Sequence, residues 1–186
     1  MSSDGKWAII TGASSGIGRA LALEFAAGGF NVLLSGRSER ALAQVARECT
    51  DKSRVLAETV PAELSRPEST DQLIAAIRAQ PRSYEVLVNN AGFGINGEFA
   101  QTDAGAEVDL LNVQLTAALK LTKAVLPAMI AKGSGRIVNV GSVYCYAPVP
   151  FQAVYSACKA FLLSFSAAIR NELSGSGVTV TVFCPG

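Results

Sequence analysis

The sequence predicts one α/β domain built around a doubly wound parallel sheet. Short apolar runs alternate with longer stretches of helical spacing along the 186 residues. Such strict alternation implies right-handed crossovers, which place the strands in one parallel sheet. Hydrophobic residues make up 49% of the chain and charged residues 17%, which argues against disorder and fits strands buried on both faces. A chain of this length is most simply a single domain.

The first half of the pattern predicts three strands and three helices. An apolar run at 7–11 indicates the first strand, and the spacing over 16–27 indicates a helix that ends at a glycine pair. A strand at 31–35 precedes a helix at 38–49, for which Ser38 is the expected N-cap. A strand at 54–60 then precedes a helix at 67–80, bounded by Pro67 and Pro81.

The second half continues the alternation with two longer loops. The strands are expected at 85–89, 136–140 and 178–183, and the helices at 104–131 and 152–173. The loops at 91–97 and 142–151 both follow the carboxyl ends of strands. Ligands bind at that edge in open α/β sheets, so we expect the functional site there.

Composition excludes several classes of function. The net charge is +1, so no long-range field recruits nucleic acid or acidic lipid. Histidine is absent, which removes the usual general base and the commonest metal ligand, and we expect no metal site. Four scattered cysteines favour reduced thiols in a cytoplasmic protein. The polar N-terminus has no signal-peptide core and no run approaches about 20 apolar residues, so we expect no membrane span.

Three glycines, Gly12, Gly16 and Gly18, lie between the first strand and the first helix. The first permits a tight turn, the second lets the backbone approach a pyrophosphate, and the third lets the helix pack closely on the strand. The backbone amides at the N-terminus of the helix, and the positive end of the helix dipole, also attract a phosphate group. A purely structural turn is the alternative, but the flanking strand and helix favour a dinucleotide site.

The second strand leads into Gly36 and Arg37, about 20 residues beyond the glycine loop, where an acidic residue would bind the adenine-ribose hydroxyls. Here Gly36 leaves space, and the guanidinium of Arg37 suits a 2′-phosphate. The sequence therefore favours NADP(H) over NAD(H). The alternative is that Arg37 is a solvated loop charge.

Tyr155, Lys159, Ser142 and Asn112 form a candidate catalytic set. Tyr155 and Lys159 are four residues apart on one helix face, where the ammonium is expected to lower the pKa of the phenol from about 10 towards neutrality. Ser142 follows a strand end and could donate to a substrate oxygen. Asn112 stands inside a long helix, where asparagine has poor propensity. Each residue has a structural explanation alone, but together with the segment 89–92 they favour redox chemistry.

These segments resemble the short-chain dehydrogenase/reductase family, in its shorter branch. The family's Thr-Gly-x3-Gly-x-Gly, Asn-Asn-Ala-Gly and Tyr-x3-Lys motifs match residues 11–18, 89–92 and 155–159. The family's acidic residue near the adenine, usually aspartate, corresponds to Glu63, and its Pro-Gly after the last strand corresponds to Pro185 and Gly186. The resemblance covers essentially the whole chain and implies a Rossmann fold of six strands in the order 3-2-1-4-5-6.

The resemblance also implies a mechanism. Tyr155 would donate a proton to a carbonyl oxygen while hydride arrives from the nicotinamide, and would take the proton back in reverse. Lys159 is expected to hold the nicotinamide ribose, Ser142 to bond the reacting oxygen, and Asn112 to position a water that connects Lys159 to solvent. The residues expected to bind cofactor are Gly12, Ser14, Ser15, Gly16, Ile17, Gly18, Arg37, Glu63, Leu64, Asn89, Ala91, Gly92, Tyr155, Lys159, Pro185 and Gly186.

Relatives in the family continue beyond the Pro-Gly with a substrate lid, a seventh strand and a final helix. We therefore expect the chain to be a fragment of a longer enzyme, with a truncated protein of weak or no catalysis as the alternative. The helix at 152–173 is apolar nearly all round, which indicates a face towards the sheet and another towards a partner. Because the family pairs this helix and the preceding one across a dimer interface, we expect a homodimer or homotetramer. Burial within one chain is the alternative.

Three functions compete. The first is an NADP(H)-dependent oxidoreductase that acts on a small-molecule ketone or aldehyde, or on the matching secondary alcohol. The second is an epimerase or dehydratase of the extended branch, which the glycine spacing disfavours. The third is a non-catalytic dinucleotide-binding or oligomerisation module. An apolar substrate is suggested by the residues of the two longer loops, which include Phe93, Ile95, Tyr144, Cys145, Tyr146, Val149 and Phe151.

Overall fold

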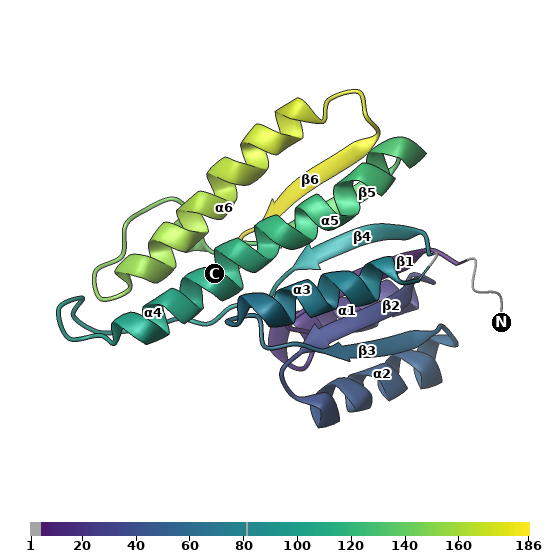
Figure 1. Cartoon of the computed structure of the whole chain (residues 1–186), viewed down its shortest axis with the longest axis horizontal. Coiled ribbons are helices and arrows are strands. Elements are labelled where there is room, and N and C mark those ends of the chain that lie inside the picture. Colours follow the sequence, from purple (N-terminus) through teal and green to yellow (C-terminus); the bar gives the residue numbers. More distant parts are fainter. Residues whose placement is uncertain (1–4, 81) are drawn as a thin grey trace.

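The computed structural model describes residues 5–80 and 82–186 and confirms the doubly wound α/β fold (Figure 1). The strands form one parallel sheet in the order β3-β2-β1-β4-β5-β6, as the resemblance implied. Their bounds are β1 Trp7–Thr11, β2 Asn31–Gly36, β3 Ala57–Pro61, β4 Tyr84–Asn89, β5 Gly135–Val140 and β6 Val178–Phe183. The strand order reverses between β1 and β4, and the loops that leave these two strands diverge there to open a crevice.

Helices cover both faces of the sheet (Figure 1). Their bounds are α1 Gly16–Ala27, α2 Glu39–Ser53, α3 Pro67–Arg78, α4 Ala104–Leu111, α5 Ala117–Lys132 and α6 Ala153–Glu172. α1 and α2 pack on one face, and α3, α5 and α6 pack on the other. A π-helical turn at Asn112–Thr116 joins α4 to α5, and a 3-10 turn at Val143–Cys145 follows β5.

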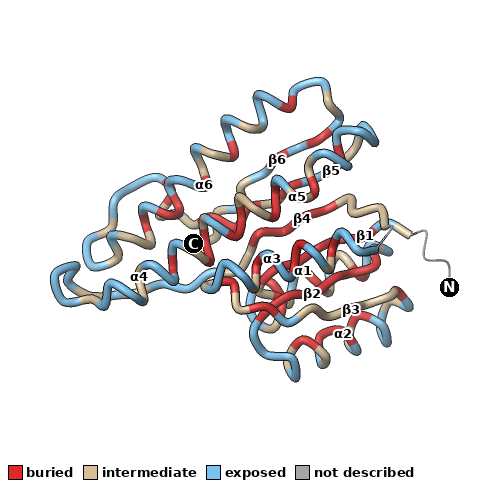
Figure 2. The backbone as a smooth tube through the Cα atoms, viewed as in Figure 1, coloured by how far each residue is buried: buried red, intermediate tan, exposed pale blue. Residues whose placement is uncertain are grey.

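The core has two layers, one on each side of the sheet. On β1, Trp7 and Ile9 face the side covered by α3 and α5, while Ala8 and Ile10 face the side covered by α1 and α2. Every residue of β1 is buried, and Figure 2 shows the central strands as the most continuously buried part of the chain. Each fully buried aliphatic side chain stabilises the fold by about 1.5–3 kcal/mol, so this sheet is a rigid support for the loops at its edge.

The element boundaries differ from the prediction by a few residues, most clearly around α2 and β3. α2 runs four residues beyond the predicted end at residue 49, to Ser53, and ends at Arg54, which adopts a left-handed conformation with φ 56°. β3 therefore begins at Ala57 rather than at residue 54. The long helix predicted over 104–131 contains the π turn, which periodicity alone does not reveal. α3 ends at Arg78, and Pro81, its predicted boundary, lies outside the described residues.

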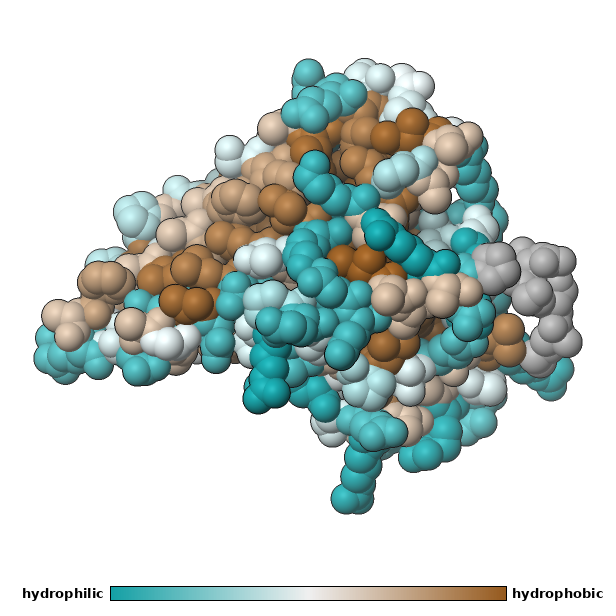
Figure 3. Space-filling model, in the orientation of Figure 1, coloured by the Kyte–Doolittle hydropathy of each residue, from teal (hydrophilic) through white to brown (hydrophobic). Residues whose placement is uncertain are grey.

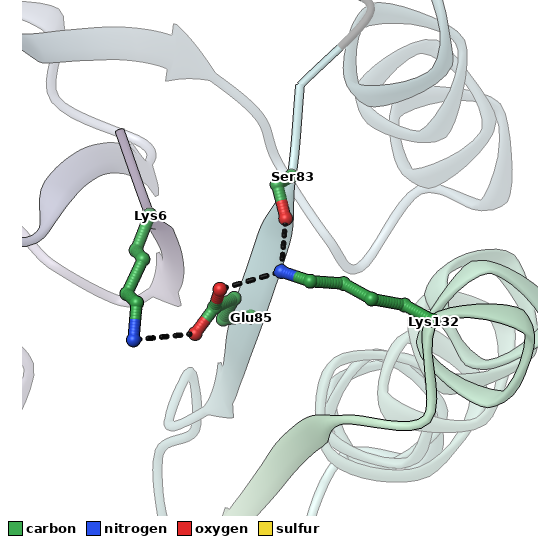
Figure 4. A network of polar contacts seen from close by, with 4 residues as sticks. All are labelled: Lys6, Ser83, Glu85 and Lys132. Atoms are coloured by element: carbon green, nitrogen blue, oxygen red, sulfur yellow. Dashed lines mark hydrogen bonds and ion pairs between the residues drawn. The ribbon is translucent and has the colours of Figure 1, made fainter. Parts of the chain in front are cut away.

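An ion-pair network ties α5 to the amino-terminal edge of the sheet, opposite the crevice (Figure 4). The Glu85 carboxylate accepts from the Lys132 ammonium at 2.5 Å. It also lies 3.5 Å from the Lys6 ammonium. Lys132 also donates to the Ser83 hydroxyl at 2.6 Å. Burial acts to raise the pKa of Glu85, but the two lysines outweigh it and the pKa is lowered. The network therefore stabilises the fold at neutral pH and loses this contribution as Glu85 is protonated in acid.

The continuous helix Ala104–Lys132 is long and apolar enough to cross a membrane, judged by length and composition alone. In the structure 44% of its apolar window is buried, and Leu121, Val125 and Met129 belong to the core beside the sheet. Packing against the sheet therefore accounts for the buried part of this window.

Candidate active site

A cleft of about 570 Å³ opens at the carboxyl edge of the sheet, where the sequence predicted a site. The loops that follow all of the described strands contribute to its walls, together with the first turns of α1 and α6. Most predicted site residues meet here: the lining includes Gly12, Ser14, Ser15, Gly16, Ile17, Arg37, Glu63, Leu64, Ala91, Gly92, Ser142, Tyr155, Lys159, Pro185 and Gly186. Residues outside the predicted set also line it, namely Gly36, Ala62, Asn90, Phe93, Gly94, Val113, Val140 and Gly141.

The N-terminus of α1 opens into this cleft. Ser15 is the N-cap residue, but its side chain makes no capping hydrogen bond, so the amides of the first turn stay available. Gly16 has φ 54°, and a Cβ added there would meet nothing within 4 Å, so the backbone faces open space. No acidic side chain stands in the first turn. The site therefore offers free amides and a positive dipole end to an anionic group such as a phosphate.

Gly12 and Gly18 hold the glycine loop in shape. A Cβ on Gly18 would lie 2.2 Å from the Gly12 carbonyl oxygen, which is the close packing that the glycine spacing predicted. Gly12 has φ 65°, and a Cβ there would lie 2.9 Å from the Cα of Ala91. Gly18 does not line the cleft itself. Its role in the structure is to let α1 approach the turn.

A hydrogen-bonded clamp between β1 and β4 fixes the loop from behind. The Thr11 hydroxyl accepts from the backbone amides of Asn90 and Ala91 at 3.0 and 3.1 Å. The Asn90 side-chain amide donates in turn to the backbone carbonyls of Thr11 and Gly12 at 2.9 and 3.3 Å. Sequence reasoning did not place Asn90 in the site, although its position in the Asn-Asn-Ala-Gly segment was the available signal.

Asn89 lies beneath the cleft instead of lining it. Its side-chain amide donates to the Asn139 side chain at 2.8 Å and to the Thr122 hydroxyl at 3.3 Å. These bonds join β4 to β5 and to α5, so Asn89 is a buried brace. Asn89 was expected among the cofactor-binding residues, and in the structure its side chain bridges two neighbouring strands without lining the cleft.

Asn112 does not line the cleft either. Its side-chain amide donates to the Ser65 carbonyl at 3.1 Å, towards the loop that follows β3. The helix amide that reaches the cleft wall belongs to Gln114, which is 2% exposed and donates to the Phe93 carbonyl at 3.0 Å. Gln114 was missed by sequence reasoning. The signal was a second amide two residues further along an apolar helix; Gln114 does not line the cleft itself, but it holds Phe93, which does.

Arg37 and Glu63 stand together at the end of the cleft formed by β2 and β3. The Arg37 Nε lies 3.9 Å from a Glu63 carboxylate oxygen, and the Arg37 side chain is 73% exposed. Such an exposed and long ion pair contributes little to stability, so the guanidinium is free to turn towards an anionic ligand. Glu63 also accepts from the Ser65 hydroxyl at 3.2 Å, which holds its carboxylate beside the cleft.

Tyr155, Lys159 and Ser142 meet at the opposite end of the cleft, beside Pro185 and Gly186. The Ser142 hydroxyl accepts from the Tyr144 amide at 3.3 Å, which fixes the turn after β5. Lys159 is 4% exposed, and its ammonium lies 5.3 Å from the centre of the Tyr155 ring. The helix spacing of four residues thus places both side chains in one crevice, as predicted.

The electrostatics of this pair differ from the prediction. The Lys159 ammonium donates to the Val140 carbonyl at 2.8 Å, and burial lowers the pKa of the lysine. Burial also raises the pKa of the half-buried Tyr155, and its hydrogen bond with Ser142 opposes this only in part. The prediction that Lys159 holds the phenol pKa below 10 is therefore wrong for this structure. Desolvation by burial is the largest cause of the raised pKa of Tyr155.

Comparisons with known proteins identify the family. The short chain dehydrogenase family profile matches residues 6–186. Ketoacyl reductase HetN of Nostoc sp. is 37% identical over 182 residues, which cover 98% of this chain and 63% of that relative. A short-chain dehydrogenase from Sphingobium yanoikuyae, solved with NADPH, superposes with a TM-score of 0.90 at 37% identity, covering 95% of this chain and 69% of the other.

A metagenomic short-chain oxidoreductase solved with NADP superposes over the full length of this chain. Its TM-score is 0.91 at 34% identity, and the match covers 84% of that protein. The shared fold, the family profile and the identity to a curated relative agree. The chain belongs to the short-chain dehydrogenase family.

Proposed function

We propose that this single Rossmann domain carries both the cofactor site and the catalytic residues of an NADP(H)-dependent oxidoreductase. One observation supports this above the others. Tyr155, Lys159 and Ser142 share a cleft with the free N-terminus of α1, so a dinucleotide on the glycine loop would extend towards the tyrosine. The glycine cradle and the free amides fit a pyrophosphate.

In this proposal the chain's own side chains handle the proton. Tyr155 donates its phenolic proton to the carbonyl oxygen of the substrate, and Ser142 donates a hydrogen bond to the same oxygen as negative charge develops on it. The bound cofactor would supply hydride to the carbonyl carbon, so the product is a secondary or primary alcohol. Lys159 would hold the nicotinamide-ribose hydroxyls and place positive charge near the phenol. In the reverse direction Tyr155 accepts the proton.

Asn112 and Asn89 support the site from outside its wall. Asn112 begins the π turn and bonds Ser65, which links the long helix to the loop that carries Glu63 and Leu64. Through this link we propose that Asn112 keeps the adenine end of the cleft in place. Asn89 holds β4 against β5 beneath the nicotinamide end.

NADP(H) is the cofactor that the residues favour over NAD(H). The exposed guanidinium of Arg37 stands where a 2′-phosphate would lie, beyond the space left by Gly36. Both structural relatives described above were solved with NADPH or NADP. Charge attraction between Arg37 and the 2′-phosphate is the interaction that would separate the two cofactors.

The substrate is proposed to be a small apolar carbonyl compound or the matching alcohol. Phe93, Tyr146 and Phe151 are 36%, 70% and 57% exposed on the two loops that border the catalytic end. Large apolar groups of this kind favour a ligand with apolar surface beside its reacting carbonyl. The name of the Nostoc relative, a ketoacyl reductase, agrees with a ketone substrate.

A homodimer or homotetramer is proposed through α4, α5 and α6. Val108, Leu111, Ile130 and Phe161 on these helices are 53%, 38%, 44% and 38% exposed. Figure 3 shows apolar surface over the part of the molecule where these helices lie in Figure 1. A contiguous apolar surface of this kind marks an interaction site. We place the protein in the cytoplasm, in keeping with its four free thiols.

The proposed function is tested by Tyr155→Phe, with Tyr144→Phe as the matched control. NADPH absorbance is followed with a panel of apolar ketones, and NADPH binding is measured by fluorescence titration. Tyr155→Phe should lower kcat by roughly 10²–10⁴-fold while NADPH still binds, because general acid catalysis is worth about that much. Tyr144→Phe should keep its activity. Equal turnover by Tyr155→Phe and the wild type would reject the role of Tyr155.

A wild-type chain that binds NADPH yet consumes none with any ketone would favour the second candidate, a non-catalytic dinucleotide-binding module. That candidate stays open because the chain spans 63% of the length of the Nostoc relative.

A further inference from the structure

Two cysteines on neighbouring loops bring their sulfur atoms together at the catalytic end of the cleft. Cys145 lies in the 3-10 turn after β5, and Cys184 follows the last residue of β6. Their Sγ atoms are 3.8 Å apart. Both sulfurs occupy the space above Gly141, where an added Cβ would lie 2.8 Å from Cys145 Sγ and 3.0 Å from Cys184 Sγ. The bare backbone at Gly141 therefore makes room for the pair.

Each sulfur accepts a hydrogen bond from a neighbour. The Ser142 amide donates to Cys145 Sγ at 3.4 Å, and the Tyr146 hydroxyl donates to Cys184 Sγ at 3.8 Å. The Cys184 thiol donates to Cys145 Sγ. The thiolate is the reactive form in thiol–disulfide exchange, and the contact between the two sulfurs holds them within reach of each other. This environment is suited to chemistry between the two sulfurs.

The two cysteines differ in access, which sets the order of reaction. Cys145 is 6% exposed, and burial raises the pKa of its thiol, with the Ser142 amide opposing the shift. Cys184 is partly exposed at the cleft edge. A small oxidant therefore meets Cys184 first, and Cys145 waits behind it as the resolving thiol.

We propose that Cys145 and Cys184 form a reversible dithiol–disulfide pair whose oxidation state controls the cofactor cleft. The oxidant is a small disulfide of the oxidised-glutathione class. The Cys184 thiolate attacks one sulfur of this molecule, which forms a mixed disulfide and releases one thiol. The Cys145 thiolate then attacks Cys184 Sγ and releases the second thiol. Two cysteine thiols are oxidised to one disulfide, and one small disulfide is reduced to two thiols.

The bond would pull on two walls of the cleft. Its length of about 2.0 Å requires the sulfurs to approach by roughly 1.8 Å. Cys145 belongs to the turn that begins at Ser142, and Cys184 directly precedes Pro185, and both of these neighbours line the cleft. The Val143 amide already donates to the Pro185 carbonyl at 3.1 Å, so the two loops move as connected segments. Closing the bond therefore changes the shape of the end that would receive the nicotinamide.

The other two cysteines provide matched controls. Cys49 is fully buried on α2 and does not line the cleft. Its thiol donates to the Ala22 carbonyl at 3.7 Å. Cys158 is buried on α6, and desolvation raises the pKa of its thiol to about 11. Cys49→Ser is the preferred control, because Cys158 adjoins Lys159.

The experiment equilibrates the chain with oxidised and reduced glutathione at several ratios, then traps free thiols and maps disulfides by peptide mass. We expect a Cys145–Cys184 disulfide that reverses with dithiothreitol and persists in Cys49→Ser. Cys184→Ser should give neither the disulfide nor a glutathione adduct, and Cys145→Ser should stop at a glutathione adduct on Cys184. If the wild-type chain keeps both thiols reduced, or stops at a glutathione adduct on Cys184, the proposed Cys145–Cys184 disulfide is wrong.

Control of the cleft is read from NADPH affinity in the two redox states, a measurement that rests on the proposed function. We expect the disulfide to weaken NADPH binding by about fivefold or more, the lower end of typical coupling between sites. Cys49→Ser should bind NADPH as the wild type does in each of the two redox states. Equal NADPH affinity in the two redox states would show that the disulfide does not regulate the cleft. A reduced chain that binds no NADPH would reject the cofactor assignment, while the disulfide map would still decide the chemistry of the pair.

Discussion

The Lys159 ammonium donates to the Val140 carbonyl at 2.8 Å, while the phenol of Tyr155 stands beside it without the pKa shift that the spacing suggested. The carbonyl belongs to the last residue of β5, so a helix side chain is tied to the strand whose following turn carries Ser142. This bond places Lys159 and Ser142 on one rigid support. The Lys159 ammonium is buried, and among the described residues its hydrogen-bond acceptor is the Val140 carbonyl.

Replacing Lys159 should separate stability from activity. Lys159→Met removes a buried charge and fills the same space with an apolar side chain, so its Tm should equal or exceed that of the wild type. Its turnover should be lost, since no ammonium remains to hold the nicotinamide-ribose hydroxyls. Calorimetry and NADPH consumption give the two readouts. Lys159→Arg, which keeps the charge with a different shape, is the matched control for turnover.

The same substitution has a pH signature. The pKa of Lys159 is lower in the folded chain than its ordinary value near 10.4, so the unfolded chain binds more protons between these two values. Wild-type stability should therefore rise with pH across that window relative to Lys159→Met. A constant difference between the two chains throughout the window would contradict the lowered pKa.

The phenol of Tyr155 should ionise above its ordinary pKa of about 10 when no cofactor is added, because burial disfavours the phenolate. The ultraviolet phenolate absorbance of the wild type minus that of Tyr155→Phe gives its titration curve. In the reduction of a ketone the protonated phenol is the donor, so activity should fall as pH rises through the pKa of the loaded enzyme. A difference curve with its midpoint below 10 would show that Lys159 dominates after all.

Arg37→Ala should weaken NADPH binding by about tenfold to a hundredfold and leave NADH binding nearly unchanged. A hydrogen bond between charged groups contributes about 1.5–3 kcal/mol, and only NADPH carries the 2′-phosphate. Arg40→Ala, an equally charged and exposed change in the first turn of α2, is the control and should affect both cofactors little. Equal losses for NADPH and NADH would remove Arg37 from phosphate recognition.

Asn112 and Gln114 should respond differently to truncation. Gln114→Leu deprives the Phe93 carbonyl of its donor at the cleft wall, so kcat/KM for ketone and NADPH should fall. Asn112→Ala removes a bond to Ser65 near the surface and should cost about 0.5–1.5 kcal/mol of stability, with a smaller effect on turnover. Both constants are measured for each variant. If only Asn112→Ala loses turnover, Asn112 rather than Gln114 supports the active site.

The sequence predicted the parallel sheet and most of its site because both depend on local patterns. Buried parallel strands are rich in apolar runs, as the central strands β1, β2 and β4 are, and all six strands lie within a few residues of the expected places. Positions that follow strand ends converge at one edge in any such sheet, so the glycine loop, Arg37, Ser142 and Tyr155 line one cleft there.

The tertiary structure alone decided the orientation and environment of particular side chains. The π turn lets Gln114 donate to Phe93 behind the cleft wall while Asn112 bonds Ser65, and a single extra residue in a helical turn leaves no trace in apolar spacing. The pKa of Tyr155 depends on how deeply neighbouring loops bury it, and the meeting of Cys145 with Cys184 joins segments 39 residues apart. Periodicity determines which elements form and in what order. Desolvation and long-range contacts exist only once those elements have packed.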